Sequence, residues 1–472
     1  MNLLTAASMI DRLTYDVAVI GGGNAALCAA ITARQAGARV VVLERAPHAL
    51  RGGNSRHTRN FRCVHNAPGL YLTGTYTEDE FMADLRSVNG AALDEALARV
   101  AVVGSESCPA WMAGQGVRFQ AALHGTLQLA RTNLFFLGGG KALMNTYYAV
   151  AERTGIEVLY DADVVDLEVR DGRFESATVR EGSRTHTIRA SAVVVASGGF
   201  EANLEWLRSV WGPAADNFII RGTPHNTGVP LKRLLASGAQ PVGDARECHA
   251  IAVDARAPKF DGGIVTRLDC IPLGIVVNSL GQRFYDEGED VWPKRYAIWG
   301  KLIARQPGQI AYSVVDAKSA DRFMPSVFPP IVAGSIRELA DRLPLPPGSL
   351  EATVNAFNAA VRPGTLDLRT LDDCHTEGLS PEKTHWAQRL DCPPYWAYPL
   401  RPGITFTYLG LKVDDRTRVL MKGGYAADNV FAAGEVMAGN ILVNGYLAGF
   451  GMTIGTVFGR IAGEEAARHA VG

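Results

Sequence analysis

The sequence has few cysteines, and none of them is paired in a motif. Its 472 residues include seven scattered Cys, with no C-x-x-C pair of the kind that binds zinc, an iron–sulfur cluster or haem. We therefore expect no metal site, and we expect a reducing compartment. The sequence also lacks an apolar run of about 20 residues, the length needed to cross a bilayer.

Net charge is nearly absent as well. Lys and Arg total 47 against 48 Asp and Glu, a formal charge of -1, so no overall field favours nucleic acid or an anionic membrane. The first residues, MNLLTAASMIDRL, have neither the basic leader nor the cleavage site of a signal peptide. These features predict a cytoplasmic protein that does not bind nucleic acid.

Glycine and apolar residues, by contrast, are abundant. The chain has 50 Gly and 47% hydrophobic residues, which permits a large core and, at this length, two domains. Residues 15–44 follow the order strand, glycine-rich turn, helix, strand that a dinucleotide fingerprint requires. Gly21, Gly23 and Ala26 occupy its small-residue positions, and Glu44 ends the second strand, where a carboxylate accepts ribose hydroxyls.

A change of composition predicts an inserted domain. Many of the Pro and Trp residues, and helical patterns such as SIRELADRL and SLEATVNAFNAAV, fall in residues 251–395. We predict an α/β nucleotide-binding domain built from residues 1–250 and 396–472, with residues 251–395 forming an α+β cap. A site between two such domains can close and exclude water.

Several motifs together resemble one family. VAVIGGGNAALCAA, GGNS, GGGKAL, ASGGF, FAAGE and GRIAGEEAA resemble the fumarate reductase and succinate dehydrogenase flavoprotein superfamily. Within it, GGNSRHTRNFR, DEGEDVWPKRYAIWG and GYLAGFGMTIGTVFGRIAG resemble FAD-dependent tricarballylate dehydrogenases, which oxidise propane-1,2,3-tricarboxylate to cis-aconitate. A related flavoprotein half occurs in a fused cobalamin-biosynthesis protein, and that function remains an alternative.

The resemblance implies a Rossmann-like FAD domain of the glutathione-reductase and fumarate-reductase type with an inserted capping domain. It also implies FAD-binding residues: Gly21, Gly23, Asn24, Ala25, Glu44, Arg45, Gly53, Asn54, Ser55, Gly140, Ala196, Ser197, Gly198, Gly434, Glu435 and Leu447. Succinate dehydrogenases attach FAD through the His of a Ser-His-Thr triplet. Here Arg56 follows Ser55 and His57 comes one residue late, so we predict non-covalent FAD.

Dehydrogenation beside a carboxylate needs an anion clamp, a base for the α proton and a hydride acceptor. Arginine suits the clamp because its planar fork matches a carboxylate. The resemblance assigns proton transfer to Arg295, with Arg283 in support, and places His249 on a substrate carboxylate. His225 is expected in a turn that faces the flavin edge.

Two departures from the reductase pattern bear on the substrate. Thr405 and Phe406 stand where reductases have a carboxylate-binding His, and Tyr446 stands where they have a second Arg. Simple fumarate reduction is therefore not expected. Tyr446 in Gly-Tyr-x-x-Gly-x-Gly is similar to the Tyr of ketosteroid dehydrogenases that binds a carbonyl.

The opposing evidence is a set of arginines next to the GGNS motif. Arg56, Arg59 and Arg62 are spaced three apart, so on one helical face they would bind several carboxylates, which a steroid does not need.

Three hypotheses follow. The first is a tricarballylate dehydrogenase, or a dehydrogenase of a similar polycarboxylate. The second is a flavoenzyme for a neutral ketone such as a 3-ketosteroid, with Tyr446 as acid. The third is an electron-transfer or biosynthetic flavoprotein. Since the sequence has no cysteine cluster, we expect reduced FAD to pass its electrons to oxygen, a quinone or a separate protein. The resemblance to tricarballylate dehydrogenases implies an iron–sulfur or haem membrane protein as the acceptor, which would place the chain at the periphery of the inner membrane.

Overall fold

The computed structural model describes residues 14–122, 128–324 and 326–472. The expectation about the first 13 residues falls outside this range. The main sheet has the strand order β20-β21-β9-β1-β2-β6, and all neighbours are parallel except the β20–β21 pair. Its strands are β1 (Thr14–Ile20), β2 (Val40–Leu43), β6 (Glu157–Leu159), β9 (Arg184–Val195), β20 (Arg418–Leu420) and β21 (Ala426–Ala432).

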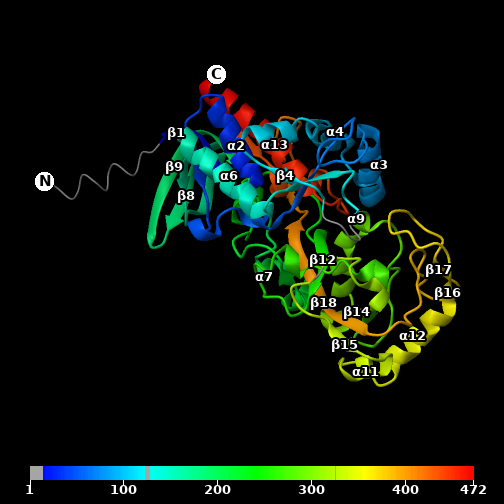
Figure 1. The fold of residues 1–472 in the computed structure, drawn as a ribbon. Helices are drawn as coiled ribbons and strands as arrows, with labels where there is room; N and C mark the ends of the chain where they lie inside the picture. The colour runs from blue at the N-terminus through cyan, green and yellow to red at the C-terminus, as the bar shows by residue number, and fades with distance from the viewer. Residues whose placement is uncertain (1–13, 123–127, 325) are drawn as a thin grey trace.

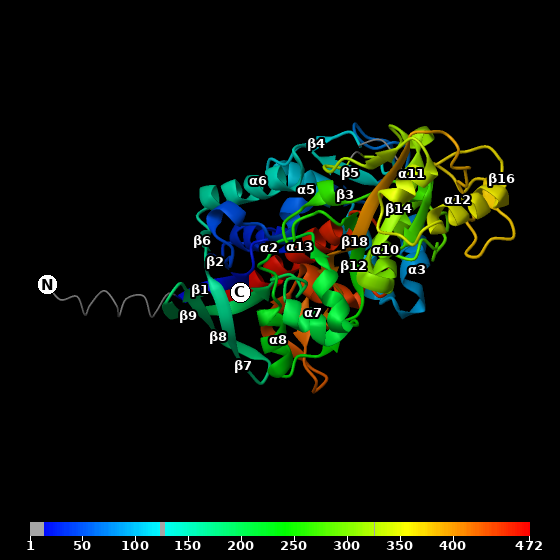
Figure 2. The same cartoon turned by 90° about the horizontal axis from the view of Figure 1, so that it is seen from below.

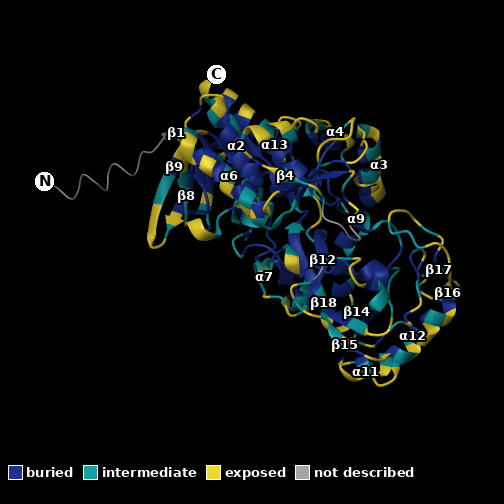
Figure 3. Cartoon of the chain, in the orientation of Figure 1, coloured by how far each residue is buried: buried dark blue, intermediate teal, exposed yellow. Residues whose placement is uncertain are grey.

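Helices α2 (Asn24–Gln35) and α13 (Phe450–Val471) pack side by side in the core of this domain. Glycines on α13 permit the close approach: a Cβ on Gly459 would lie 2.5 Å from the carbonyl oxygen of Ala25. Figure 3 shows buried residues concentrated on these helices and the central strands. The predicted strand, turn, helix and strand over residues 15–44 are confirmed.

The rest of this domain surrounds the sheet. Strands β7 (Asp163–Arg170) and β8 (Arg173–Glu181) extend it in antiparallel fashion from β9. A small sheet contains β3 (Asn60–Arg62), β4 (Phe119–Gln120) and β5 (Asn133–Phe136). The accompanying helices are α3 (Glu78–Asn89), α4 (Glu95–Gly104), α5 (Cys108–Gly114), α6 (Gly139–Thr154), α7 (Leu204–Trp211) and α8 (Val229–Ala236).

The second body is a mixed sheet with helices, seen at the lower right of Figure 1. Strand β18 (Tyr395–Thr407) pairs with β10 (Ile219–Ile220), β12 (Cys248–Asp254), β14 (Ala311–Asp316) and β15 (Ile331–Ala333), and β14 pairs with β13 (Ile275–Asn278). Its helices are α9 (Trp292–Arg295), α10 (Trp299–Ala304), α11 (Ile336–Asp341) and α12 (Ser349–Ala360). Two short pairs, β11 (Pro241–Val242) with β19 (Gly410–Leu411) and β16 (Val361–Arg362) with β17 (His375–Thr376), complete the strands.

The cap sheet therefore uses strands on both sides of the segment that composition singled out. The expected boundaries at 250/251 and 395/396 fall inside β12 and β18, two antiparallel strands that extend between the cap and the first domain (Figure 1). The exact division into domains stays a prediction. Among the described helices, none combines the length and the apolar character needed to cross a membrane.

Candidate active site

One cavity lies between the main sheet and the strands β12 and β18. Its volume is about 1470 Å³, including space open to solvent. Predicted residues that line it are Gly21, Gly23, Asn24, Ala25, Glu44, Arg45, Gly53, Asn54, Ser55, Arg59, Ala196, Ser197, Gly198, His225, His249, Thr405, Gly434, Glu435 and Tyr446. Predicted residues that do not line it are Gly140, Leu447, Arg56, Arg62, Arg283 and Arg295.

The end of the cavity beside the main sheet has the features of a dinucleotide site. Gly21 has φ 108°, and a Cβ there would clash with the carbonyl of Ala196. Helix α2 begins at Asn24, and its positive N-terminal end faces the cavity, where it favours an anion such as a pyrophosphate.

Glu44 lies at the end of β2 on the same part of the cavity wall. It is 5% exposed, and its carboxylate accepts hydrogen bonds from the backbone N–H of Ala46 at 2.8 Å and of Gly52 at 3.3 Å. Burial raises the pKa of Glu44, and these backbone donors oppose that rise. The carboxylate is thus fixed in place at a position from which it can accept ribose hydroxyls.

Most buried polar atoms without a hydrogen-bond partner in the described part of the chain lie elsewhere, but four of them belong to residues that line this cavity. These four are Ser197 Oγ, His225 Nε2, Arg59 Nη2 and Arg221 Nη1. Buried polar groups are normally satisfied, so these atoms indicate ligands with complementary groups. The glycine turn, the helix end, Glu44 and Ser197 together fit an adenine dinucleotide, and the arginines indicate a second, anionic ligand.

A polar network joins the GGNS motif to both domains. The Asn54 amide donates to Glu201 Oε1 at 2.5 Å and to the Thr405 carbonyl at 2.7 Å. Asn226 donates to the same Glu201 oxygen at 2.8 Å, and Glu435 accepts from the Thr407 backbone N–H at 2.8 Å. Burial, followed by the charge of Glu201, raises the pKa of Glu435 well above its usual range. Burial thus favours the protonated form of both Glu201 and Glu435.

A cluster of buried arginines occupies the end of the cavity beside the cap. Arg221 is 6% exposed, its Nε donates to Thr405 Oγ1 at 3.1 Å, and its Nη1 has no hydrogen-bond partner among the described residues. Burial and then the charge of Arg267 lower the pKa of Arg221 to about 10 and that of Arg59 to about 9. Positive charge is therefore concentrated here, as an anion site requires.

Only part of this charge is balanced within the protein. Arg267 Nη2 lies 2.8 Å from Asp269 Oδ2, and Arg59 Nη2 lies 3.8 Å from the same carboxylate oxygen. Sequence reasoning found Arg59 but missed Arg221 and Arg267. Arg221 lies in RGTPHNTG, the same segment as His225, so its proximity to that motif was the available signal.

Three aromatic side chains stand beside the arginines. His249 Nε2 lies 3.1 Å from Tyr296 Oη, and the ring centroids of His249 and Tyr446 are 4.2 Å apart. Burial, with Arg221 and Arg267, lowers the pKa of His249 well below its usual range, so the imidazole is neutral. His249 and Tyr446 thus line the cavity, their catalytic roles stay predictions, and Tyr296, which sequence reasoning did not select, lies beside them.

Arg295 and Arg283 need a correction, because both lie away from the cavity. Arg295 ends α9 and lies 3.2 Å from Glu289 with a quarter of its side chain exposed. Arg283 is almost fully buried in the cap, where it forms an ion pair with Glu287 and donates to the Pro381 carbonyl at 2.6 Å. The conformation around α9 turns Tyr296, rather than Arg295, toward the cavity.

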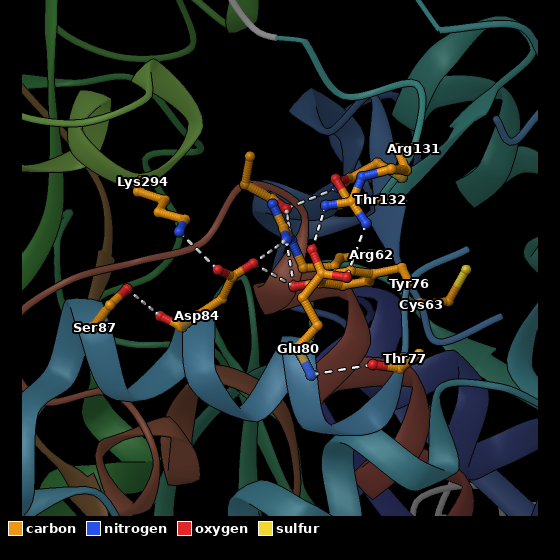
Figure 4. A network of polar contacts seen from close by, with 12 residues as sticks. Arg62, Cys63, Tyr76, Thr77, Glu80, Asp84, Ser87, Arg131, Thr132 and Lys294 are labelled. Atoms are coloured by element: carbon orange, nitrogen blue, oxygen red, sulfur yellow. Dashed lines mark hydrogen bonds and ion pairs between the residues drawn. The ribbon is translucent and has the colours of Figure 1, made fainter. Parts of the chain in front are cut away.

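The expectation of a helical face with three arginines is wrong. Residues Gly53–His57 form a short 3-10 helix, and Asn60–Arg62 form strand β3, so the three side chains diverge. Arg56 donates to the Leu50 carbonyl at 2.9 Å. Arg62 donates to Tyr76 Oη at 2.7 Å and lies 3.6 Å from Asp84, which also pairs with Lys294 of the cap (Figure 4). Only Arg59 lines the cavity.

Two predicted FAD residues act behind the cavity wall. Gly140 N donates to the Thr58 carbonyl at 2.8 Å, and a Cβ on Gly140 would clash with the Ser55 backbone, so this glycine supports the GGNS motif. Leu447 is fully buried in the hydrophobic core. His57 does line the cavity, with its Nε2 2.5 Å from Asp261 Oδ1. Non-covalent attachment of the cofactor stays a prediction.

The structure thus combines a dinucleotide-binding α/β domain, a cap and a cluster of buried arginines suited to an anion. Comparison of the sequence with known families shows which family the chain belongs to. The model of a family described as the FAD binding domain matches residues 16–454. The chain belongs to this FAD-binding family, which confirms both the predicted fold class and FAD as the cofactor.

Individual proteins match the chain at low sequence identity. The chain is 25% identical to an NADH:acrylate oxidoreductase of Vibrio harveyi, over 96% of this chain and 50% of that protein. It is 26% identical to a 3-oxosteroid 1-dehydrogenase of Mycobacterium tuberculosis, over 66% of this chain and 60% of that one. The chain thus spans about half the length of the first relative.

The fold is also found among solved structures. A flavocytochrome c3 fumarate reductase in an open conformation superposes with a TM-score of 0.75 and 23% identity, over 100% of this chain and 81% of that chain.

Proposed function

We propose that this protein is an FAD-dependent oxidoreductase that dehydrogenates a C–C bond next to a carboxylate. The observation that carries the proposal is the buried arginine cluster on the cavity that fits FAD, in which Arg59 Nη2 and Arg221 Nη1 have no hydrogen-bond partner among the described residues. Bound FAD would supply the acceptor for the hydride that leaves the β carbon. The chain itself would bind the anion, exclude water and handle the α proton.

The arginines suit this chemistry for an electrostatic reason. Removing a proton next to a carboxylate builds negative charge on the carboxylate oxygens, and fixed guanidinium groups stabilise that charge most in a buried site. Among the described residues, Arg59 and Arg267 share the carboxylate of Asp269, and Arg221 forms no ion pair, so positive charge exceeds negative charge in this cluster. A neutral substrate would leave this excess charge unpaired at a considerable cost.

Among anions, we propose a polycarboxylate, and tricarballylate oxidised to cis-aconitate as the particular reaction. Arg59 and Arg221 have donors without a hydrogen-bond partner among the described residues, so each would bind one carboxylate, and Arg267, paired with Asp269, would add positive charge beside them. The motif resemblance to tricarballylate dehydrogenases supports the same choice. For reoxidation we propose a separate iron–sulfur or haem protein at the membrane. The likeness to a flavocytochrome is consistent with a haem acceptor.

A second candidate is oxidation of a 3-ketosteroid. It is favoured by Tyr446, which lines the cavity and accepts a hydrogen bond from the Gly451 backbone N–H at 2.8 Å, so its own O–H remains available to a carbonyl. The similarity to a 3-oxosteroid 1-dehydrogenase also supports this second candidate. The excess positive charge of the arginine cluster opposes it.

Anaerobic mixing of the FAD-loaded protein with substrates separates these candidates. Tricarballylate, succinate, citrate and a 3-ketosteroid are each added while the absorbance of oxidised flavin is followed. We expect tricarballylate to bleach the flavin. Bleaching by the steroid alone would establish the second candidate and refute the first. If no compound bleaches the flavin, the electron-transfer or cobalamin-biosynthesis role becomes the better explanation.

A further inference from the structure

Tyr296 is buried in the cavity wall next to the arginine cluster. It is 3% exposed and begins the 3-10 helix Tyr296–Ile298, directly after α9. The guanidinium of Arg267 lies over its ring, 4.7 Å from the centroid. This packing fixes the ring, so the phenol oxygen keeps one position on the cavity.

The phenol has a partner that can take its proton. Tyr296 Oη lies 3.1 Å from His249 Nε2, within hydrogen-bond distance. In the tautomer that carries its proton on Nδ1, the neutral imidazole of His249 accepts at Nε2 the hydrogen bond that the Tyr296 O–H donates. His249 lies on β12 at an irregularity in the pairing with β18, which directs its side chain toward the cavity.

Burial and the neighbouring arginines act in opposite directions on the phenol of Tyr296. Burial raises the pKa of Tyr296, so it is protonated at rest, while Arg267, Arg221 and Arg59 lower that pKa. Asp269 is the acidic group that acts against them. A phenol held by a neutral base and three guanidinium groups is suited to pass a proton in either direction.

We propose that Tyr296 exchanges the α proton with the substrate, and that His249 receives the phenolic proton. In the oxidative direction, the α C–H bond breaks and its proton forms an O–H bond at Oη. At the same time the original phenolic proton moves to His249 Nε2, which becomes an imidazolium. Arg221 and Arg267 disfavour this imidazolium in the empty site, and the substrate carboxylates that they bind offset that effect. The electron pair of the C–H bond stays with carbon and completes the new double bond when the β hydride leaves. The inference rests on the proposed function and assigns its proton-transfer group.

The test compares the activities of variants at Tyr296 and at two nearby residues. Tyr296→Phe keeps the ring but removes the hydroxyl, His249→Gln keeps an acceptor for the phenol but takes up no proton, and Arg295→Ala is the matched control outside the cavity. For each FAD-loaded variant, the rate of anaerobic flavin reduction by tricarballylate is measured. The affinity for cis-aconitate is measured separately from the change in flavin absorbance, which reports binding without turnover.

We expect Tyr296→Phe to slow reduction by at least about 100-fold and His249→Gln by at least about 10-fold. Cis-aconitate affinity should stay within about threefold for Tyr296→Phe, and Arg295→Ala should match the wild type. Near wild-type reduction by Tyr296→Phe would overturn the inference while the proposed function stands. If another compound in the panel reduces the flavin of the wild type and tricarballylate does not, tricarballylate is refuted as the substrate. The reduction rates of the variants are then measured with that other compound. If no compound reduces the flavin, both proposals are refuted.

Discussion

The Arg221→Met substitution is expected to weaken polycarboxylate binding and, at the same time, to make the protein without that ligand more stable. Arg221 is buried with two other arginines near it, and its pKa falls from 12.5 to about 10. That fall corresponds to about 3 kcal/mol by which the folded protein disfavours the charged side chain. Methionine fills much of the same space without charge.

The expected magnitudes follow from these contacts. Loss of the hydrogen bond to Thr405 costs about 1 kcal/mol, so the net gain in unfolding free energy is about 2 kcal/mol. Loss of a charge-assisted hydrogen bond to a carboxylate costs about 1.5–3 kcal/mol of binding free energy, which raises the Kd for cis-aconitate about 10- to 150-fold. Thermal unfolding and flavin absorbance titrations measure the two effects.

Arg283→Met is the matched control, because it removes an equally buried arginine that has a partner. Its removal leaves Glu287 buried and unpaired, which should destabilise the protein by about 3 kcal/mol or more without changing cis-aconitate affinity. If Arg221→Met also lowered the melting temperature and left the affinity unchanged, Arg221 would be a structural residue. The reasoning for the anion site would then be wrong.

Three further predictions concern other parts of the molecule. The raised pKa of Glu435 means that the folded state binds an extra proton between about pH 4.5 and that raised pKa. Within this window the contribution of Glu435 to stability should fall by about 1.4 kcal/mol per pH unit, and thermal melts should show a shallower slope for Glu435→Gln. Acid denaturation should release the flavin into the filtrate, whereas flavin that comigrates with the polypeptide would show attachment at His57. Asp84→Asn removes the ion pairs to Arg62 and Lys294 and should destabilise by about 3 kcal/mol. Its control, Asp216→Asn, breaks an exposed pair and should cost less than about 1 kcal/mol; equal melting temperatures would contradict a structural role for Asp84.

The dinucleotide-binding half of the site could be predicted from the sequence because its residues are close together in the chain. Gly21, Gly23 and Glu44 belong to one continuous strand, turn, helix and strand, and each position has a local requirement. Gly21 has a positive φ, and Glu44 ends a short buried strand. Patterns of this length follow from backbone geometry and periodicity.

The anion-binding half of the site could not be predicted in the same way. Arg59, Arg221 and Arg267 come from three separate segments, and neither spacing nor residue type distinguishes them from the other arginines. Arg56 and Arg62 show how misleading spacing is, since a short 3-10 helix followed by a strand separates side chains that a helix would have aligned.

The sequence by itself thus determined the family, the cofactor and the general position of the flavin site, because these depend on local motifs. Only the tertiary structure decided which charged and aromatic side chains meet in the cavity. Adjacent side chains in a helical segment point about 100° apart, so Arg295 pairs with Glu289 while Tyr296 lines the cavity. That choice is made by packing between the cap and the FAD domain, which no local pattern in the chain specifies.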